Sequence, residues 1–205
     1  MKRVLSVIVL LTFMTAMVSA QSWQLLNDAQ SKEQVAKICA AHKRVKTIKS
    51  KFKQTKESAM LSQPLVSEGN LEYSSAANFI KWEYVSPFYS CFQMKDNKVS
   101  VKQGSGAKKS SSAPGAKMFQ GLANIMMSAF NGKSLSDTKN FNCQVYRSGN
   151  VVSVWLSPKK AMMKKAFKQM KMYFNPKTSI VDKLEIIGAN GDTTTIEFTG
   201  LKVEN

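Results

Sequence analysis

Histidine, arginine and cysteine are scarce in this sequence, and the motifs of common enzymes are missing. The chain of 205 residues has one histidine, His42, and three cysteines, and it has 13 acidic residues against 30 basic ones. One histidine excludes the paired-histidine zinc site of metalloproteases and other His-rich metal centres. A P-loop, a Gly-x-Gly-x-x-Gly fingerprint and a Gly-x-Ser-x-Gly nucleophile elbow are also absent. We therefore predict a binding protein without catalytic residues, metal or cofactor.

Two groups of residues are weaker candidates for a catalytic role. Glu68, Glu72 and Glu83 lie close together in the sequence and are the only candidates for an acid–base pair, but their alternation places them on solvated strand faces. His42 falls beside the apolar stripe of a predicted helix, and a lone histidine there is typical of a packed residue. Neither candidate favours an enzyme.

The three cysteines allow at most one internal disulfide in an oxidising compartment. Cys91 and Cys143 both lie in runs that alternate like strands, and they would pair if those strands were neighbours. The alternative is that Cys39, Cys91 and Cys143 are all buried thiols, which behave as small apolar side chains.

Arginine is rare beyond residue 20, where only Arg44 and Arg147 occur, so the net charge of +17 comes mostly from lysine. Lysine gives a diffuse positive field, whereas phosphate and base recognition favours clustered arginine. We therefore expect no nucleic acid as partner. Anionic lipid head groups or an acidic protein face would suit the charge, and plain solubility is the alternative.

Long apolar runs are confined to the N-terminus. Lys2 and Arg3 precede the apolar run 4–17, and the small residues of 18–20 fit a signal-peptidase site. Residues 1–20 are therefore predicted to be a secretion signal cleaved after Ala20. No later run is long enough to span a bilayer. Residues 21–205 are enough for one exported domain with its own core.

Two stretches have helical periodicity. The first follows a candidate capping box at 31–34, and its spaced residues are Val35, Ile38, Cys39, His42 and Val45. The second, 117–131, is rich in methionine and apolar on most of its girth, and it follows the Gly- and Ser-rich linker 104–115. A movable lid and a static buried helix are both consistent with that pattern. Residues 158–167 are either a short basic helix or a loop.

Most other segments alternate apolar and polar residues, as half-buried antiparallel strands do. In 69–101 three such runs follow one another, separated by turn residues. In the run from Thr47, the exposed positions are Lys49, Lys51 and Lys53. These lysines either steer docking to an acidic partner or anionic lipid, or serve solvation only. The pattern predicts about nine to eleven strands and two or three helices in a mainly β (α+β) fold, with the helices against one face of a large curved antiparallel sheet.

The order and spacing of several short motifs resemble those of the periplasmic outer-membrane lipoprotein carrier family (LolA-like). The shared motifs, in chain order, are Phe52-x-Gln54-Thr55, Gly69-x-Leu71-x-Tyr73, Trp82-Glu83-Tyr84-x-x-Pro87, the turn Asp96-Asn97-Lys98, Leu156-Ser157-Pro158, Gly191-Asp192-x-Thr194-x-Ile196-x-Phe198 and the ending Leu201–Asn205. One departure is clear. The family often has an Arg-Pro after the Gly69 strand whose arginine latches the helical lid, and this chain has Ser74-Ser75-Ala76-Ala77 there.

The resemblance implies an unclosed, strongly curved β-barrel whose apolar cavity takes the acyl chains of lipoproteins. It also implies a monomer that receives acylated lipoproteins from an inner-membrane ABC-type release complex and delivers them to an acceptor at the outer membrane. An envelope lipid-binding sensor or adaptor with the same half-barrel fold is the alternative. The predicted cavity residues are Ile48, Phe52, Leu71, Tyr73, Ile80, Trp82, Tyr84, Phe92, Met94, Leu122, Ile125, Met126, Met170, Met172, Phe174, Leu184, Ile186, Ile196 and Phe198.

Overall fold

The fold is a single antiparallel sheet of eleven strands, seen in a computed structural model that describes residues 22–96, 98–104, 127, 130, 135 and 137–205. The elements are β1 (Gln24–Leu25), α1 (Asp28–Lys43), β2 (Thr47–Glu57), β3 (Leu65–Ser74), β4 (Phe79–Ser86), β5 (Ser90–Lys95), β6 (Lys98–Gln103), β7 (Phe141–Ser148), β8 (Val151–Pro158), α3 (Ala161–Lys164), β9 (Phe167–Phe174), β10 (Val181–Gly188) and β11 (Thr193–Glu204). The predicted strand count is confirmed at its upper limit.

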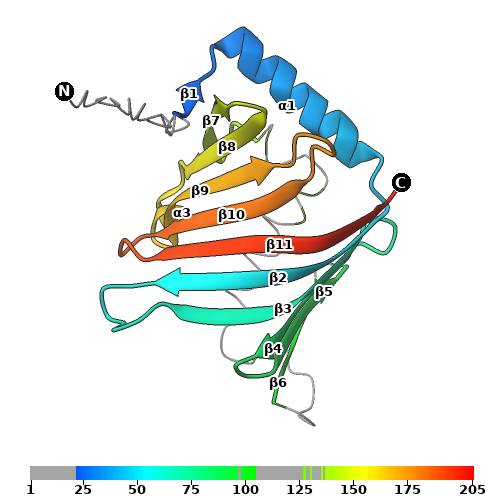
Figure 1. Ribbon diagram of the computed structural model, residues 1–205, viewed down its shortest axis with the longest axis vertical. Coiled ribbons are helices and arrows are strands. Elements are labelled where there is room, and N and C mark those ends of the chain that lie inside the picture. Colours follow the sequence, from blue (N-terminus) through cyan, green and yellow to red (C-terminus); the bar gives the residue numbers. More distant parts are fainter. Residues whose placement is uncertain (1–21, 97, 105–126, 128–129, 131–134, 136) are drawn as a thin grey trace, which may run out of the picture.

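Two meanders make up the sheet. The strand order is β1-β7-β8-β9-β10-β11-β2-β3-β4-β5-β6, so β2 to β6 form one half and β7 to β11 the other. The long pairing of β11 with β2 joins the halves, from Thr193 opposite Glu57 to Glu204 opposite Thr47. β1 and β6 are the two ends of the order and leave the barrel open. Figure 1 shows the sheet bending from β7 and β8 near α1 to β4–β6 at the bottom. The predicted unclosed, curved antiparallel fold is confirmed.

Helix α1 begins earlier than its pattern predicted. Its N-cap is Asn27, which forms a capping box with Gln30, while the hydroxyl of Ser31 donates to the Leu26 carbonyl. The predicted box at 31–34 is therefore wrong, because a second polar pair lay four residues upstream. The predicted apolar side of the helix is confirmed by Ile38 and His42, which are buried.

The second predicted helix, 117–131, lies outside the described residues except for Met127 and Phe130. Both of these are helical and buried. The linker 104–115 lies outside them as well, beyond Gly104. Residues 158–167 contain the short helix α3, which was one of the two alternatives.

The strands that carry Cys91 and Cys143 are not neighbours, so of the two alternatives for the cysteines the bridge between these two is not formed. Cys91 lies on β5 and Cys143 on β7, near opposite ends of the strand order. None of the three cysteines, all of which belong to the described part of the chain, forms a disulfide. Cys91 is buried, and Cys39 and Cys143 are half-buried.

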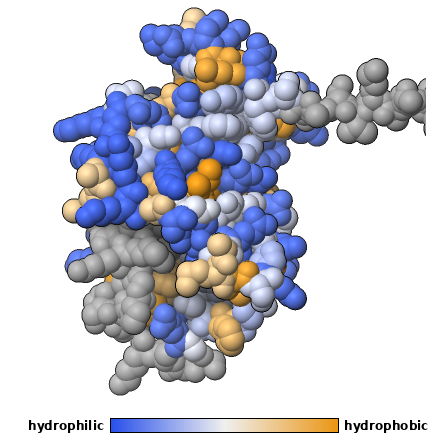
Figure 2. Space-filling model, turned by 90° about the vertical axis from the view of Figure 1, so that its left-hand side faces the viewer, coloured by the Kyte–Doolittle hydropathy of each residue, from blue (hydrophilic) through white to orange (hydrophobic). Residues whose placement is uncertain are grey.

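Lysine side chains are exposed on the outer face of the sheet. Lys49, Lys51 and Lys53 are exposed along β2. Hydrophilic side chains cover much of the face in Figure 2, with hydrophobic ones among them. In the part of the chain that the structure describes, no helix has the length and apolar character needed to cross a bilayer.

Candidate functional site

The inner face of the sheet is the candidate site, and the strand register builds it in rows. In the first half, Ile48 of β2 lies opposite Tyr73 of β3, Tyr73 opposite Ile80 of β4, and Ile80 opposite Met94 of β5. Because side chains alternate along a strand, these four point to the same side of the sheet. All four are buried.

The second half continues this face with methionine and branched aliphatic residues. Val154 of β8 lies opposite Met172 of β9, Met172 opposite Leu184 of β10, and Leu184 opposite Ile196 of β11. Val154, Met172 and Leu184 are fully buried, and Ile196 is 1% exposed. The result is one continuous apolar surface across both meanders.

Sixteen of the nineteen predicted cavity residues are described, and all sixteen belong to or pack against one apolar cluster. Thirteen are buried, and Tyr84, Phe92 and Ile186 are partly buried. Leu122, Ile125 and Met126 lie outside the described residues. Sequence reasoning left out several members of the cluster, among them Phe141, Val145, Val154, Leu156, Phe167, Ile180 and Val181. The alternation of β8 was the signal for Val154 and Leu156, whereas Ile180 lies outside any strand.

Aromatic rings gather where β2, β3 and β4 meet. The ring centroid of Phe52 lies 4.5 Å from that of Trp82 and 5.2 Å from that of Tyr84. Phe198 of β11 adds a further ring, 6.0 Å from Trp82. Gly69 makes this packing possible, because a Cβ atom there would clash with the Phe52 ring and with the Glu83 carbonyl oxygen.

Helix α1 and two described residues of the second helical segment shield the inner face. The ring of Phe130 lies 5.2 Å from that of Tyr73, and Phe130 is 1% exposed. His42 reaches across from α1: its Nδ1 lies 3.0 Å from the Phe130 carbonyl oxygen, and its Nε2 lies 2.9 Å from the Ser179 carbonyl oxygen. The prediction that His42 is a packed residue is confirmed.

One of the three acidic candidates, Glu83, has structural partners on the outer face. Glu83 accepts hydrogen bonds from Asn70 and Tyr89, and it pairs with Lys81 at 3.3 Å. Partial burial works to raise the pKa of Glu83, but the hydrogen bonds and Lys81 outweigh it and lower the pKa below its ordinary value. A pocket of about 200 Å³ beside it is lined by Lys81, Glu83, Tyr89, Cys91, Gln93, Ser100 and Lys102. It opens on the polar side of β4–β6, away from the apolar face.

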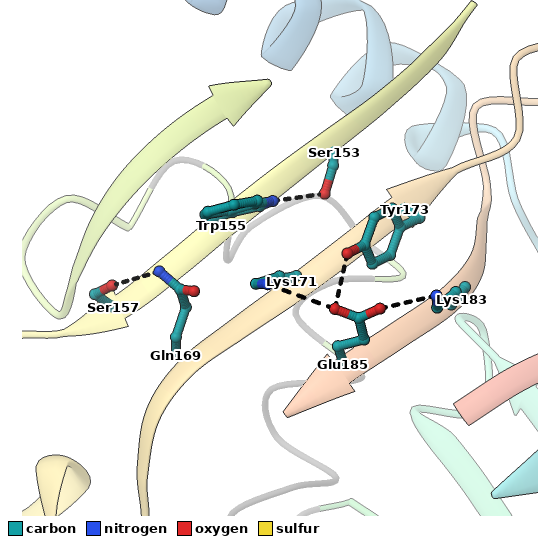
Figure 3. Close-up of polar contacts among 8 residues, drawn as sticks. All are labelled: Ser153, Trp155, Ser157, Gln169, Lys171, Tyr173, Lys183 and Glu185. Atoms are coloured by element: carbon teal, nitrogen blue, oxygen red, sulfur yellow. Dashed lines mark hydrogen bonds and ion pairs between the residues drawn. The ribbon is translucent and has the colours of Figure 1, made fainter. Parts of the chain in front are cut away.

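A second polar cluster lies on the outer face of β8, β9 and β10 (Figure 3). Glu185 accepts a hydrogen bond from the Tyr173 hydroxyl at 2.8 Å and pairs with Lys183 at 2.8 Å and Lys171 at 3.6 Å. Lys171 also lies 4.4 Å from the centre of the Trp155 ring. Burial raises the pKa of Tyr173, and its bond to Glu185 adds to that effect. These groups hold one another in place, and the described residues contain no cluster of three metal ligands.

Comparison with protein families identifies the chain. The family model described as "Outer membrane lipoprotein carrier protein LolA" matches residues 43–205. This chain belongs to the LolA family. The matched region runs from the end of α1 to the last residue, so it includes ten of the eleven strands and the whole apolar face of this LolA family member.

Several solved structures are similar to this chain at low sequence identity. A LolA superfamily protein from Nitrosomonas europaea is 8% identical, over 85% of this chain and 94% of its own, with a TM-score of 0.44. MucB is 10% identical, over 87% of this chain and 60% of its own, with a TM-score of 0.50. A putative outer membrane lipoprotein-sorting domain from Vibrio parahaemolyticus is 9% identical, over 85% and 94%, with a TM-score of 0.42. A comparison with curated proteins finds no match.

Proposed function

We propose that this protein is a periplasmic carrier that binds the acyl chains of lipoproteins against its inner face and moves them from the inner to the outer membrane. Membership of the LolA family supports the general role. The observation that carries the proposal is the continuous apolar surface, in which residues such as Trp82, Met172 and Leu184 form one face across both meanders. The described residues of this face contain no catalytic arrangement, and we propose that the protein binds its cargo without catalysing a reaction.

Acyl chains would enter this face by exchange with the residues that shield it. Tyr73, Ile80 and Met172 are no more than 3% exposed, so nothing as thick as an alkyl chain fits beside them while the shielding side chains stay in place. Phe130 and Met127 are the described shielding residues on the segment opposite the sheet, and both are buried. We expect an acyl chain to take over their contacts.

Exchange makes both binding and release feasible. Burying one CH₂ group of an acyl chain gains about 0.8 kcal/mol, so one long chain would gain on the order of 10 kcal/mol in an empty cavity. Displacing Phe130 and Met127 exposes apolar area and offsets part of this gain. Methionine at Met94, Met170 and Met172 suits a surface that must repack, because its side chain is unbranched and flexible.

Tryptophan quenching by a brominated lipopeptide tests the site. Trp82 is 1% exposed within the aromatic cluster, whereas Trp155 lies on the outer face. A variant with Trp23→Phe and Trp155→Phe retains only Trp82. We expect a diacylated lipopeptide brominated along its chains to quench this variant, because bromine would come into contact with the Trp82 ring.

The matched control keeps Trp155 in place of Trp82, by Trp23→Phe with Trp82→Phe, and should show little quenching at the same occupancy. Occupancy is measured separately by co-elution of the lipopeptide in mass spectrometry. Equal quenching of both variants, or occupancy without quenching of Trp82, would place the acyl chain elsewhere.

Carriage between membranes requires a second assay. Inner-membrane vesicles bearing the proposed ABC-type release complex should release a lipoprotein only when the protein is present, and outer-membrane vesicles should then accept it. A protein that binds the lipoprotein but never transfers it would instead be a sensor or adaptor.

The mass of the protein isolated from cells should correspond to a chain that begins at Gln21, as the proposed cleavage after Ala20 requires.

A further inference from the structure

Exposed apolar side chains concentrate at one end of the sheet, where β2, β4 and β8 end. Seven of the nine large hydrophobic residues that are exposed in the described part of the chain lie there, and we refer to them as the apolar rim. They are Met60, Leu61, Leu65, Val66, Val85, Phe88 and Met162. The most exposed are Met60 at 91%, Met162 at 84% and Phe88 at 82%, and each comes from a different connection.

Contacts between the connections show that this rim is one edge of the molecule. Lys56, at the end of β2, pairs with Asp192 in the β10–β11 turn at 3.6 Å. In that same turn, the Ala189 amide donates to the Ala166 carbonyl beside α3. Ser86, at the end of β4, lies opposite Glu68 of β3, which brings the β4–β5 connection alongside. This edge is on the left in Figure 1, and Figure 2 looks directly onto it.

The rim carries a strong positive charge on its α3 side. The stretch from 159 to 168 contains five lysines and no acid, and Lys159, Lys160, Lys164, Lys165 and Lys168 are all exposed. The acids near the rim are Glu57, Glu68, Asp137 and Asp192, of which Asp192 already pairs with Lys56. Pale orange and blue side chains are accordingly interspersed over this end in Figure 2.

We propose that this end of the sheet docks on an anionic lipid surface, with Met60, Phe88 and Met162 inserted among the outer acyl carbons and the α3 lysines against the lipid phosphates. Single apolar side chains on separate loops suit shallow insertion into a bilayer, while lysines near an anionic surface each strengthen binding roughly five-fold. A protein partner would instead require a contiguous apolar centre with few charges. This docking does not rest on the proposed carrier function, since it uses the surface of the protein without cargo.

Co-sedimentation with vesicles tests the proposal, using the cargo-free protein with vesicles of phosphatidylethanolamine and phosphatidylglycerol. We expect binding that weakens as salt rises, and much weaker binding to phosphatidylcholine vesicles. The triple variant Met60→Ser, Phe88→Ser, Met162→Ser should lower the affinity at least tenfold. Replacing Lys159, Lys160, Lys164 and Lys165 by glutamine should lower the affinity by up to several hundred-fold, because four roughly five-fold contributions multiply, and it should flatten the salt dependence.

Two control variants match these changes at other exposed places. Leu25→Ser removes an exposed apolar side chain from β1, and replacing Lys49, Lys51 and Lys53 by glutamine removes lysines from the outer face of β2. Both should bind vesicles nearly as wild type does. A Phe88→Trp variant should show a blue shift of its emission on vesicles, because the indole would enter the lipid.

Three results would overturn the proposal. The first is no binding of the wild-type protein to anionic vesicles. The second is equal loss of binding in the rim and control variants, which would show that vesicle binding does not depend on where on the surface the apolar and basic side chains lie. The third is that the rim substitutions leave vesicle binding unchanged but abolish binding to an acidic protein, which would make the rim a protein-docking surface. All the substituted side chains are exposed, so the variants should fold, and circular dichroism checks this.

Discussion

His42 of α1 and Phe130 are joined by a contact between the imidazole Nδ1 and the Phe130 carbonyl oxygen, 3.0 Å apart. The other ring nitrogen faces the Ser179 carbonyl oxygen at 2.9 Å. A neutral imidazole donates from one nitrogen, so only the doubly protonated ring donates to both carbonyls. His42 therefore links α1 to Phe130, one of the residues that shield the inner face.

Replacing His42 by alanine should lower the free energy of unfolding by about 2 to 3 kcal/mol. The change removes the imidazole from the buried Phe130 carbonyl oxygen and the part-buried Ser179 carbonyl oxygen. It also opens a gap beside Phe174, whose ring lies 6.1 Å from the imidazole. Urea denaturation followed by circular dichroism measures this loss. Lys43→Ala, at the next and exposed position, is the control and should change stability by less than about 0.5 kcal/mol. A His42 variant as stable as that control would contradict the linking role.

The Gly69→Ala variant should destabilise the sheet by about 2 kcal/mol or more. An added methyl group would clash with the Phe52 ring and with the backbone carbonyl of Glu83, and the backbone cannot move without disturbing the β3–β4 pairing. Thermal unfolding and near-UV circular dichroism of the aromatic cluster report the change. Ser67→Ala, two residues earlier on the same face, is the control. An unchanged near-UV spectrum in the Gly69 variant would show that the ring has room to move.

Local pattern was enough to predict the strands and the apolar face, because each strand has one buried side and its side chains alternate with a period of two. Ile48 and Phe52 could therefore be assigned to the face from β2 alone. The start of α1 was missed because two consecutive polar pairs, at 27/30 and 31/34, both suit a capping box, and only Asn27 with Gln30 forms it.

Pairings between distant segments could not be predicted. β11 joins β2, and His42 contacts residues 88 and 137 positions away, with no local signal for either partner. The same limit explains why a bridge between Cys91 and Cys143 stayed an open alternative, since both strands look alike in sequence and only the strand order separates them. The apolar rim was missed for a related reason: Met60, Phe88 and Met162 gather only once the sheet exists.

Glu185 should stabilise the folded protein more at neutral than at acidic pH. Partial burial works to raise its pKa, but Lys183, Tyr173 and Lys171 outweigh this and hold the pKa below the ordinary value of 4.5. A carboxylate with a lowered folded pKa contributes stability above its unfolded pKa and loses it as the pH falls through the folded one. Glu185→Gln should therefore be less stable than wild type near pH 7, with a difference that shrinks below pH 4.5.

Denaturant titrations at several pH values measure that difference. Glu197→Gln on β11 is the control for removing one exposed negative charge. A stability difference that is the same at neutral and acidic pH would mean that the Glu185 charge is not what the cluster uses.

Cys143 should resist thiol reagents in the folded protein at neutral pH. Burial, with a smaller contribution from the nearby Cys39, raises the pKa of the Cys143 thiol to about 11, so almost none of it is thiolate at pH 7. Brief treatment with iodoacetamide followed by peptide mass spectrometry should leave Cys143 unmodified, while the unfolded protein should be modified at all three cysteines without prior reduction. Rapid modification of native Cys143 would show that β7 and α1 separate readily. If modification of the unfolded protein required a reductant, the protein would contain a disulfide. A disulfide between Cys91 and Cys143 would contradict this sheet order, because the two residues lie on distant strands.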